Sequence, residues 1–280
     1  MPTALASLHN RRIKALARLT KRRERDSRRL TVVEGLREID RALKSGIIPT
    51  EAFICPAMIQ DAQAEWVTER LYQLDRDRLT HLFEITPEIF ARVAYRSDSG
   101  GLLMVIPYLE TRLDQLVNQK PTFLAVIEGV EKPGNLGAIL RSADGAGVDG
   151  IIACTGAGQE ATDIHNPNVI RASLGTLFNV PVAESTSSAA LHWLRQQGVA
   201  IVATSPDAQM PYTAIDLKGP VAVVFGSEAH GLSELWIEAS DQRVLIPMAG
   251  IADSLNLSTS TALLLYEVVR QRAEGHQLSD

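Results

Sequence analysis

The sequence predicts an α/β protein in which a small α/β domain precedes a larger domain built on a parallel sheet. Two observations lead to this prediction. From residue 121 onward, short apolar runs rich in Val and Ile alternate with helical stretches, which is typical of parallel sheets whose strands are joined by helices. The length of 280 residues corresponds to about two domains at ~150 residues each.

The first domain is predicted over residues 30–106. Its expected strands are short apolar runs bounded by turn residues, at 30–33, 52–55, 81–85 and 102–106. Helices are expected between them, from Gly35 to residue 43 and over 60–74 and 87–94. The linker to the second domain is predicted over residues 107–120.

The second domain is predicted over residues 121–280. Its expected strands are the apolar runs at 123–127, 150–153, 199–203, 221–225 and 244–246. A last helix is expected over 259–272, and it is apolar nearly all round. Such a helix must be buried on several sides, which threading of the chain in a knot or a homodimer interface would achieve, and we expect a homodimer formed through this domain.

Basic residues are concentrated before the first domain, in residues 1–29. The net charge is −5, yet ten of the 28 Lys and Arg residues fall between residues 11 and 29. Such a cluster is an electrostatic footprint for phosphates, so RNA is the predicted partner. The arginines expected to contact RNA are Arg22, Arg23, Arg25, Arg28 and Arg29. A solvated helix face is the alternative, and an acid-poor, Arg-rich start is also typical of an organelle transit peptide.

The remaining composition favours the cytoplasm, with no membrane and no metal. The two cysteines, Cys55 and Cys154, cannot form a disulfide framework and fit a reducing compartment. No apolar run approaches the ~20 residues that cross a membrane. His165, His192 and His230 have no metal-ligand spacing with either cysteine.

Three segments of the second domain place small and polar residues after predicted strands. The first contains Asn135, a good helix N-cap, and Arg141, which points away from the apolar face of its helix. The second contains Gly226 and Glu228, and the third is the polar loop 254–258. Because open α/β sheets bind ligands at the carboxyl ends of their strands, these segments are predicted to form one pocket.

In combination, the motifs of these segments resemble a known family. They read Asn-x-Gly-(x)3-Arg at 135–141, Phe-Gly-x-Glu-x-x-Gly at 225–231, and Ile-Pro-Met at 246–248 followed by Ser-Leu-Asn-x-Ser at 254–258. Over roughly residues 121–275, the chain resembles the SpoU/TrmH family of RNA ribose 2′-O-methyltransferases, in the SPOUT superfamily. The resemblance implies a deep C-terminal trefoil knot, which composition alone would not suggest because true knots are rare.

The first domain carries a looser resemblance. Its Val33-Glu34-Gly35, followed by Arg37-Glu38, is similar to the ribosomal-protein-like substrate-binding domain that precedes the catalytic domain in many members of the family. This resemblance implies that the first domain contacts RNA.

The resemblance implies S-adenosyl-L-methionine as the cofactor. Gly226, Ile246 and Leu255 would hold its adenine and methionine portions, and Thr204 is a further cofactor-binding candidate. Glycine permits close backbone approach, and Ile and Leu offer apolar faces to adenine. Outside this motif context, Ile246 and Leu255 would be read as ordinary core residues.

The resemblance also implies a reaction site formed by Asn135, Arg141, Glu228, Ser254 and Asn256. Some accounts of the family make the arginine a general base, but a guanidinium stays protonated in proteins. Arg141 is better suited to bind the phosphate beside the target ribose bidentately, or to stabilise the developing alkoxide. Glu228 would then orient Arg141 or a water, the two asparagines would position the ribose, and Ser254 would shape the loop.

Ribosomal RNA is the expected substrate, with alternatives left open. These are transfer-RNA ribose methylation, methylation of ribosomal RNA as antibiotic resistance, and a non-catalytic RNA-binding protein for ribosome assembly. Two other readings fail. No G-x-G-x-x-G follows a strand, and Ser227 lacks the flanking pattern of a hydrolase nucleophile.

Overall fold

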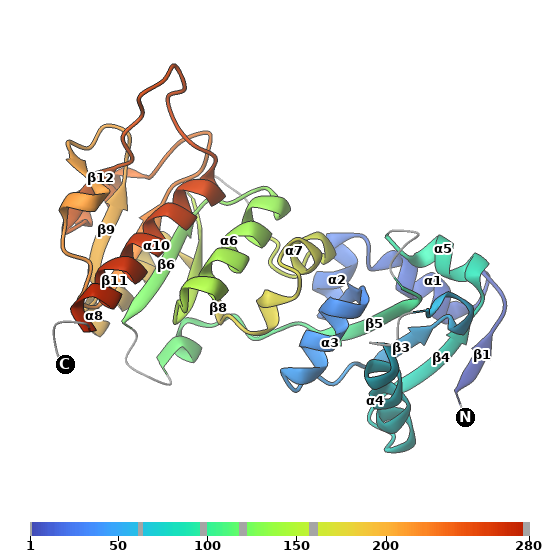
Figure 1. The fold of residues 1–280 in the computed structure, drawn as a ribbon. Coiled ribbons are helices and arrows are strands. Elements are labelled where there is room, and N and C mark those ends of the chain that lie inside the picture. The colour runs from blue at the N-terminus through green and yellow to red at the C-terminus, as the bar shows by residue number, and fades with distance from the viewer. Residues whose placement is uncertain (1, 61–63, 96–99, 118–121, 157–161, 277–280) are drawn as a thin grey trace. The chain divides into compact units, whose positions relative to one another are not determined.

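The computed structural model describes residues 2–60, 64–95, 100–117, 122–156 and 162–276. The chain divides into two compact units (Figure 1). The first comprises Met1–Leu109 and His165–Asn179, and the second comprises Glu110–Ile164 and Val180–Asp280.

The first unit is built on a five-stranded mixed sheet with strand order β1-β4-β3-β5-β2. The strands are β1 (Thr3–Leu5), β2 (Leu30–Glu34), β3 (Glu51–Ile54), β4 (His81–Ile85) and β5 (Leu102–Pro107). β4 runs parallel to β1 and β3, whereas β5 runs antiparallel to β2 and β3. The helices are α1 (Arg11–Arg18), α2 (Arg22–Arg28), α3 (Leu36–Lys44), α4 (Ala64–Arg76) and α5 (Pro87–Val93). All four predicted strands of this region are confirmed; the start of the helix predicted at 60–74 falls partly on residues 61–63, outside the described residues.

The basic segment, predicted over residues 1–29 as separate from the first domain, is folded into this unit over residues 2–29. Its strand β1 pairs with β4, and Ile13 and Leu16 of α1 join the hydrophobic core that contains Phe53 and Phe90. Apolar side chains spaced along α1 give it a core-facing side, so the charged residues occupy the other side. β1 was not predicted, because three residues are too short to show a period.

The segment His165–Asn179 packs on the first unit although its neighbours in sequence belong to the second. It contains α7 (Pro167–Ala172). The Thr31 hydroxyl donates to the His165 carbonyl at 2.6 Å, and the Leu109 amide donates to His165 Nε2 at 3.0 Å. Arg41 Nη1 donates to the Leu174 carbonyl at 2.7 Å. The chain therefore passes between the two units three times, where the sequence indicated a single passage.

The second unit is built on a seven-stranded parallel sheet with strand order β10-β12-β9-β11-β6-β7-β8. The strands are β6 (Phe123–Glu128), β7 (Gly150–Thr155), β8 (Val182–Thr186), β9 (Ala200–Thr204), β10 (Met210–Pro211), β11 (Val221–Phe225) and β12 (Gln242–Leu245). The five predicted strands and their parallel arrangement are confirmed. β8 and β10 were missed: β10 has two residues, and β8 is polar over its second half.

Among the residues described, the helices that cover this sheet are α6 (Pro133–Ala146), α8 (Ser187–Gln197), α9 (Glu234–Ala239) and α10 (Leu257–His276). α6 and α10 lie side by side across one face (Figure 1). Four apolar side chains of α10 are buried within the chain, those of Leu257, Leu264, Leu265 and Val268. Leu263 and Tyr266 remain exposed, at 38% and 50%. The apolar surface of α10 that is left for a partner is therefore one stripe, containing Leu263 and Tyr266, and not its whole circumference.

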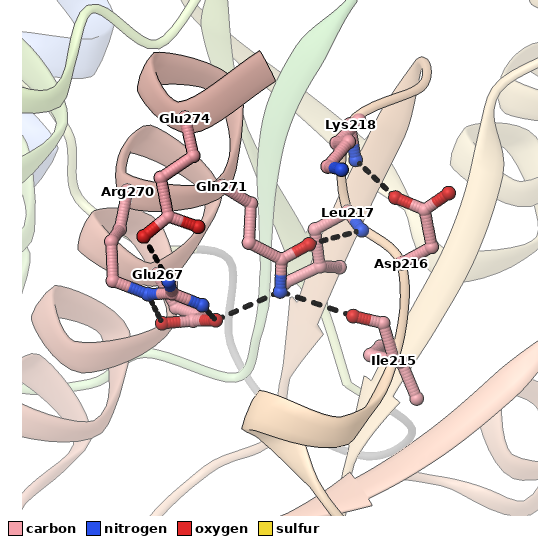
Figure 2. A network of polar contacts seen from close by, with 8 residues as sticks. All are labelled: Ile215, Asp216, Leu217, Lys218, Glu267, Arg270, Gln271 and Glu274. Atoms are coloured by element: carbon pink, nitrogen blue, oxygen red, sulfur yellow. Dashed lines mark hydrogen bonds and ion pairs between the residues drawn. The ribbon is translucent and has the colours of Figure 1, made fainter. Parts of the chain in front are cut away.

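A polar clamp fixes the C-terminal half of α10 to the loop before β11 (Figure 2). Gln271 accepts from the Leu217 amide at 2.9 Å and donates to the Ile215 carbonyl at 3.0 Å. The same Nε2 donates to Glu267 Oε1 at 2.8 Å, and Arg270 pairs with that carboxylate. Both Gln271 and Glu267 are buried, so the clamp satisfies polar groups that the packing removes from water.

Among the helices that the structure describes, none combines the length and the apolar character that a membrane-spanning helix requires.

Candidate active site

A pocket of about 230 Å³ opens at the carboxyl ends of β9, β11 and β12. Its lining includes all four residues expected to bind a cofactor: Thr204, Gly226, Ile246 and Leu255. The order β12-β9-β11 brings the three strand ends together although they are far apart in the sequence. The pocket therefore lies where open α/β sheets bind their ligands.

The walls of the pocket are mainly apolar. Phe225, Val244, Met248 and Leu257 line it together with Ile246 and Leu255. The Thr204 hydroxyl donates to the Val224 carbonyl at 3.0 Å, so this side chain is fixed across two neighbouring strands. Apolar walls with a few placed polar groups are typical of small-molecule sites.

Position 226 has room only for glycine, because the backbone of the loop after β11 packs directly against it. A Cβ at this position would lie 2.0 Å from the carbonyl carbon of Gly231 and 2.2 Å from the amide nitrogen of Leu232. Ser227 and Gly231 exchange backbone hydrogen bonds, which closes the turn against Gly226. The expectation that Gly226 allows close backbone approach is correct, but the group that approaches in this structure is the loop after β11.

Glu228 is the centre of a hydrogen-bonded cluster beside the pocket. Its Oε1 accepts from Asn135 Nδ2 at 3.0 Å and from Asn256 Nδ2 at 2.6 Å. Its Oε2 forms a close ion pair with the ammonium group of Lys132. Asn256 Nδ2 also donates to Asn135 Oδ1 at 3.2 Å. Three separate segments of sequence, as predicted, contribute side chains to one place.

Ser258 fixes the orientation of the Asn256 amide. Its backbone N–H and hydroxyl donate to Asn256 Oδ1 at 3.0 and 2.6 Å, which leaves the Asn256 amide nitrogen facing Glu228. The loop that opens α10 therefore supplies a donor to the cluster.

Asn135 does not cap its helix, contrary to the sequence-based prediction. α6 begins at Pro133, after Lys132, and Asn135 is its third residue. Pro favours the first position of a helix, so the Lys-Pro step sets the boundary. The Asn135 side chain is thereby directed to Glu228 and Asn256 instead of to its own backbone.

Hydrogen bonding holds Glu228 in its charged form. The Lys132 hydrogen bond, followed by that from Asn135, lowers the pKa of Glu228 below its ordinary value, and the Leu257 backbone adds to the effect. The same contact with Glu228 raises the pKa of Lys132. A carboxylate has about four acceptor positions, and Glu228 meets donors from Lys132, Asn135, Asn256 and the Leu257 backbone. Glu228 is therefore a fixed anion with little remaining capacity to take a substrate proton.

Lys132 was missed by sequence reasoning. Its side chain is 70% exposed, and it lines a second hollow of about 180 Å³ together with Asn135 and Glu228. The two hollows adjoin, because Ser227, Glu228 and Leu257 line both. A lysine directly before a helix N-terminus interacts unfavourably with the helix dipole, and this unfavourable placement could have indicated a functional role for Lys132.

Ser254 and Arg141 take different places. Ser254 is exposed and lines the pocket that contains Thr204, Gly226, Ile246 and Leu255, called the cofactor-type pocket below. Arg141 is exposed on α6 and lines neither of the two hollows beside Glu228. Glu228, expected to orient Arg141 or a water, forms its ion pair with Lys132 in this structure.

Glu128, at the end of β6, supports the loop that carries Glu228. It is 4% exposed, and its carboxylate accepts from the Ser187 hydroxyl at 2.6 Å, the Ser233 amide at 2.8 Å and the Ser233 hydroxyl at 2.9 Å. Ser187 begins α8 and Ser233 precedes α9, so this anion lies at two helix N-termini. Burial, together with the Glu128 charge, raises the pKa of the Cys154 thiol to about 12. Cys154 is therefore an inert core thiol.

The arginines expected to contact RNA do not form a uniform surface. Arg25 is 2% exposed, and its guanidinium donates to the Leu19 and Thr20 carbonyls at 3.1 and 3.0 Å. It closes the end of α1, so the prediction that it contacts RNA is wrong. Arg23 and Arg28 are exposed, Arg22 is half-buried, and Arg29 lies over the Tyr108 ring at 4.7 Å. Among the described residues, no group of three or more His, Cys, Asp or Glu is placed to hold a metal ion.

Comparison with known proteins agrees with this geometry. Residues 122–266 match the model of the SpoU rRNA Methylase family, and residues 10–104 match the MRM3-like substrate binding domain. The chain belongs to the SpoU rRNA methylase family.

Its relatives include two kinds of ribosomal RNA methyltransferase. A 23S rRNA (guanosine-2′-O-)-methyltransferase RlmB from Ralstonia nicotianae is 38% identical over 168 residues, which cover 59% of this chain and 66% of the relative. A 23S rRNA (uridine(2479)-2′-O)-methyltransferase from Streptomyces viridochromogenes is 30% identical over 256 residues, covering 87% and 84%. The match thus spans just under two thirds of the RlmB protein and most of the other.

Solved structures resemble the chain over nearly its full length. A crystal structure of an RNA 2′-O ribose methyltransferase has a TM-score of 0.82 and 37% identity, and the match covers 97% of this chain and 100% of that one. An AdoMet-bound rRNA methyltransferase from Sinorhizobium meliloti has a TM-score of 0.84 and 29% identity, with 96% and 97% coverage.

Proposed function

We propose that this chain transfers a methyl group from S-adenosyl-L-methionine to a ribose 2′-hydroxyl of ribosomal RNA. The observation that carries the proposal is the pocket lined by Thr204, Gly226, Ile246 and Leu255, which adjoins the cluster around Glu228. The solved relative with bound AdoMet and the names of the rRNA-methylating relatives support the same activity.

The residues of the pocket fit the proposed cofactor. Ile246, Leu255 and Phe225 offer apolar surface to an adenine ring, and the strand ends offer backbone donors and acceptors. S-adenosyl-L-methionine would supply a methyl group on a sulfonium, whose sulfur leaves as a neutral thioether, so the protein has only to align the reactants and let the 2′-hydroxyl proton pass to solvent water.

The hollow lined by Lys132, Asn135 and Glu228 is the proposed place of the target ribose. Glu228 keeps Lys132 and the two asparagines in position. One ammonium proton of Lys132 faces Glu228, and the others are free to donate to a ribose oxygen that gains negative charge. Arg141, exposed on the same helix as Asn135, would hold a neighbouring phosphate bidentately.

We propose the trefoil knot for the second unit. Family membership supports it, as does the strand order. β12 pairs at the far side of β9, and the chain then returns to form α10, which packs on α6.

We also propose a cytoplasmic homodimer. The exposed Leu263 and Tyr266 on one side of α10 support a second copy as the occupant of that face. The reduced, buried Cys55 and Cys154 fit a reducing compartment.

A pair of variants tests the proposed activity. Gly226→Ala should abolish cofactor binding in calorimetry, because the added methyl group meets backbone atoms and displaces the loop. Arg141→Ala should leave cofactor affinity within about twofold but lower kcat/KM on an unmodified 23S rRNA transcript by about 10- to 150-fold, the loss expected for a hydrogen-bonded phosphate contact.

Gly219→Ala is the matched control, since a Cβ there meets nothing within 4 Å. Absence of 2′-O-methyl groups after incubation of the folded wild-type chain with cofactor and rRNA would exclude the proposed activity. Full activity of Arg141→Ala would remove Arg141 from the site.

A further inference from the structure

Tyr95, in the first unit, is exposed and yet rigidly held. Its side chain is 56% exposed. Asn168 Nδ2 donates to its hydroxyl at 2.9 Å, and the Arg171 guanidinium lies over its ring at 5.0 Å. Its backbone N–H donates to the buried carboxylate of Glu34 at 2.6 Å. Tyr95, Asn168 and Arg171 are called the Tyr95 cluster below.

The cluster is itself internally fixed. Arg171 Nη2 donates to Asn168 Oδ1 at 2.8 Å, so the arginine, the amide and the phenol constrain one another. The backbone of Asn168 is held by the Asn166 side chain, which accepts its N–H at 2.9 Å at the start of α7. Ordering a solvent-exposed aromatic ring costs conformational entropy, and burial of the ring does not offset that cost here. A ring that is already ordered would bind a ligand without a further ordering cost, which favours affinity.

The surroundings of the cluster are basic. Arg37, Arg41 and Arg171 all lie near the carboxylate of Glu38, whose pKa is raised by burial despite these charges. Arg37 is exposed, whereas Arg41 is directed to the Leu174 carbonyl. Guanidinium groups beside an exposed aromatic ring suit an anion that carries flat rings, and a single-stranded RNA segment has both properties.

We propose that Tyr95, held by Asn168 and Arg171, is a stacking platform for an unpaired base of the RNA substrate. The inference rests on the proposed function, because it assigns a contact for the same RNA. Unpaired bases in loops and bulges stack on aromatic side chains and on arginine planes, whereas bases within a duplex cannot reach them. The platform therefore selects RNA that presents a loop.

A second exposed aromatic residue in the same unit provides a matched control. Trp66 is 44% exposed, and Lys44 Nζ lies 5.3 Å from its ring centre. Its neighbours Glu65 and Glu69 are acidic and exposed, which opposes a phosphate backbone. Trp66→Ala should leave RNA affinity unchanged.

The test measures methylation of an unmodified 23S rRNA transcript by the full chain. Tyr95→Ala should raise the KM for RNA about tenfold, as expected for loss of one base–aromatic stack, with kcat and cofactor affinity unchanged. The slope of log affinity against log salt should stay at the wild-type value, because no phosphate contact is lost. Tyr95→Phe keeps the ring and should stay within about threefold of wild type, a smaller loss than that of a stack.

Two outcomes overturn the proposal. One is a wild-type KM for Tyr95→Ala. The other is an equal KM increase for Tyr95→Ala and Tyr95→Phe with a lowered unfolding temperature, which would make the Asn168 hydrogen bond purely structural. If Tyr95→Ala itself unfolds, Tyr95→Leu decides, since it keeps apolar bulk without a π face. A wild-type chain that methylates no RNA excludes the proposed function, whereas an active wild type with a fully active Tyr95→Ala excludes only the platform.

Discussion

At the scale of single residues, the proposed reaction site depends on the carboxylate of Glu228, which is held by hydrogen bonds and an ion pair. Glu228 keeps its charge because Lys132 and two asparagines donate to it, so its pKa lies below the ordinary 4.5. For a carboxylate with a depressed pKa, the stabilising contribution is present above the ordinary pKa and is lost as the pH falls through the folded-state pKa. The cluster should therefore persist at neutral pH and loosen only in acid.

Replacing Lys132 tests this arrangement. Lys132→Met removes the largest cause of the depressed Glu228 pKa, so that pKa should rise toward 4.5. Carbon-13 NMR titration of Glu228 measures the change, and methyl transfer should fall because the ammonium donor is gone. Lys218→Met, at another exposed lysine of the same unit, should change neither quantity. An unaltered Glu228 titration in Lys132→Met would show that the asparagines alone fix its charge.

At the scale of elements, Glu128 joins the end of β6 to the starts of α8 and α9. Glu128→Gln leaves donors on Ser187 and Ser233 that a neutral amide satisfies less well, so the free energy of unfolding should fall by about 1–3 kcal/mol. Urea denaturation measures this loss. The loop after β11 should also shift, which would weaken cofactor binding. Glu110→Gln, at an exposed carboxylate of the same unit, is the control, and an equal loss there would contradict the special role of Glu128.

Helices and strands were predictable from the sequence where they are long enough to show a pattern of apolar residues. Val221–Phe225 was predicted in full, because an entirely buried strand is a continuous apolar run. β10 and β1 are too short for any pattern. The cofactor-type pocket was predicted because its residues follow strand ends, whereas Lys132 was missed because its role depends on a contact with Glu228, which is distant in the sequence. The attachment of His165–Asn179 to the first unit was missed for the same reason.

At the scale of the whole molecule, the folded state of residues 1–29 determines how their RNA contact can be tested. Deleting the segment would remove β1 and core residues of α1, so the first unit would lose packing as well as charge. Substituting Arg22, Arg23 and Arg28 by Gln avoids this. Each lost phosphate contact should reduce the slope of log affinity against log salt by roughly 0.7 to 0.9. A slope equal to that of the wild type would identify this basic run as a solvated helix face.

The proposed homodimer is a second property of the whole molecule. Light scattering at micromolar concentration should give twice the mass of the 30.5 kDa chain. Tyr266→Lys, on the exposed side of α10, should shift the equilibrium toward the monomer because a charge would enter an apolar interface. Lys218→Met serves again as the control. A monomeric wild type would mean that α10 needs no partner.

The threefold passage of the chain between units has a consequence for its synthesis. The first unit includes residues up to Asn179, so a ribosome that has released residue 109 has not yet made the segment that completes it. At ~5–20 residues per second, that segment emerges about 4 to 14 s later. During this interval the strands of the second unit that lie between are also emerging. The first unit therefore cannot complete its packing until residues 110–164 of the second unit have been synthesised, so the first unit is not complete when its N-terminal part leaves the ribosome.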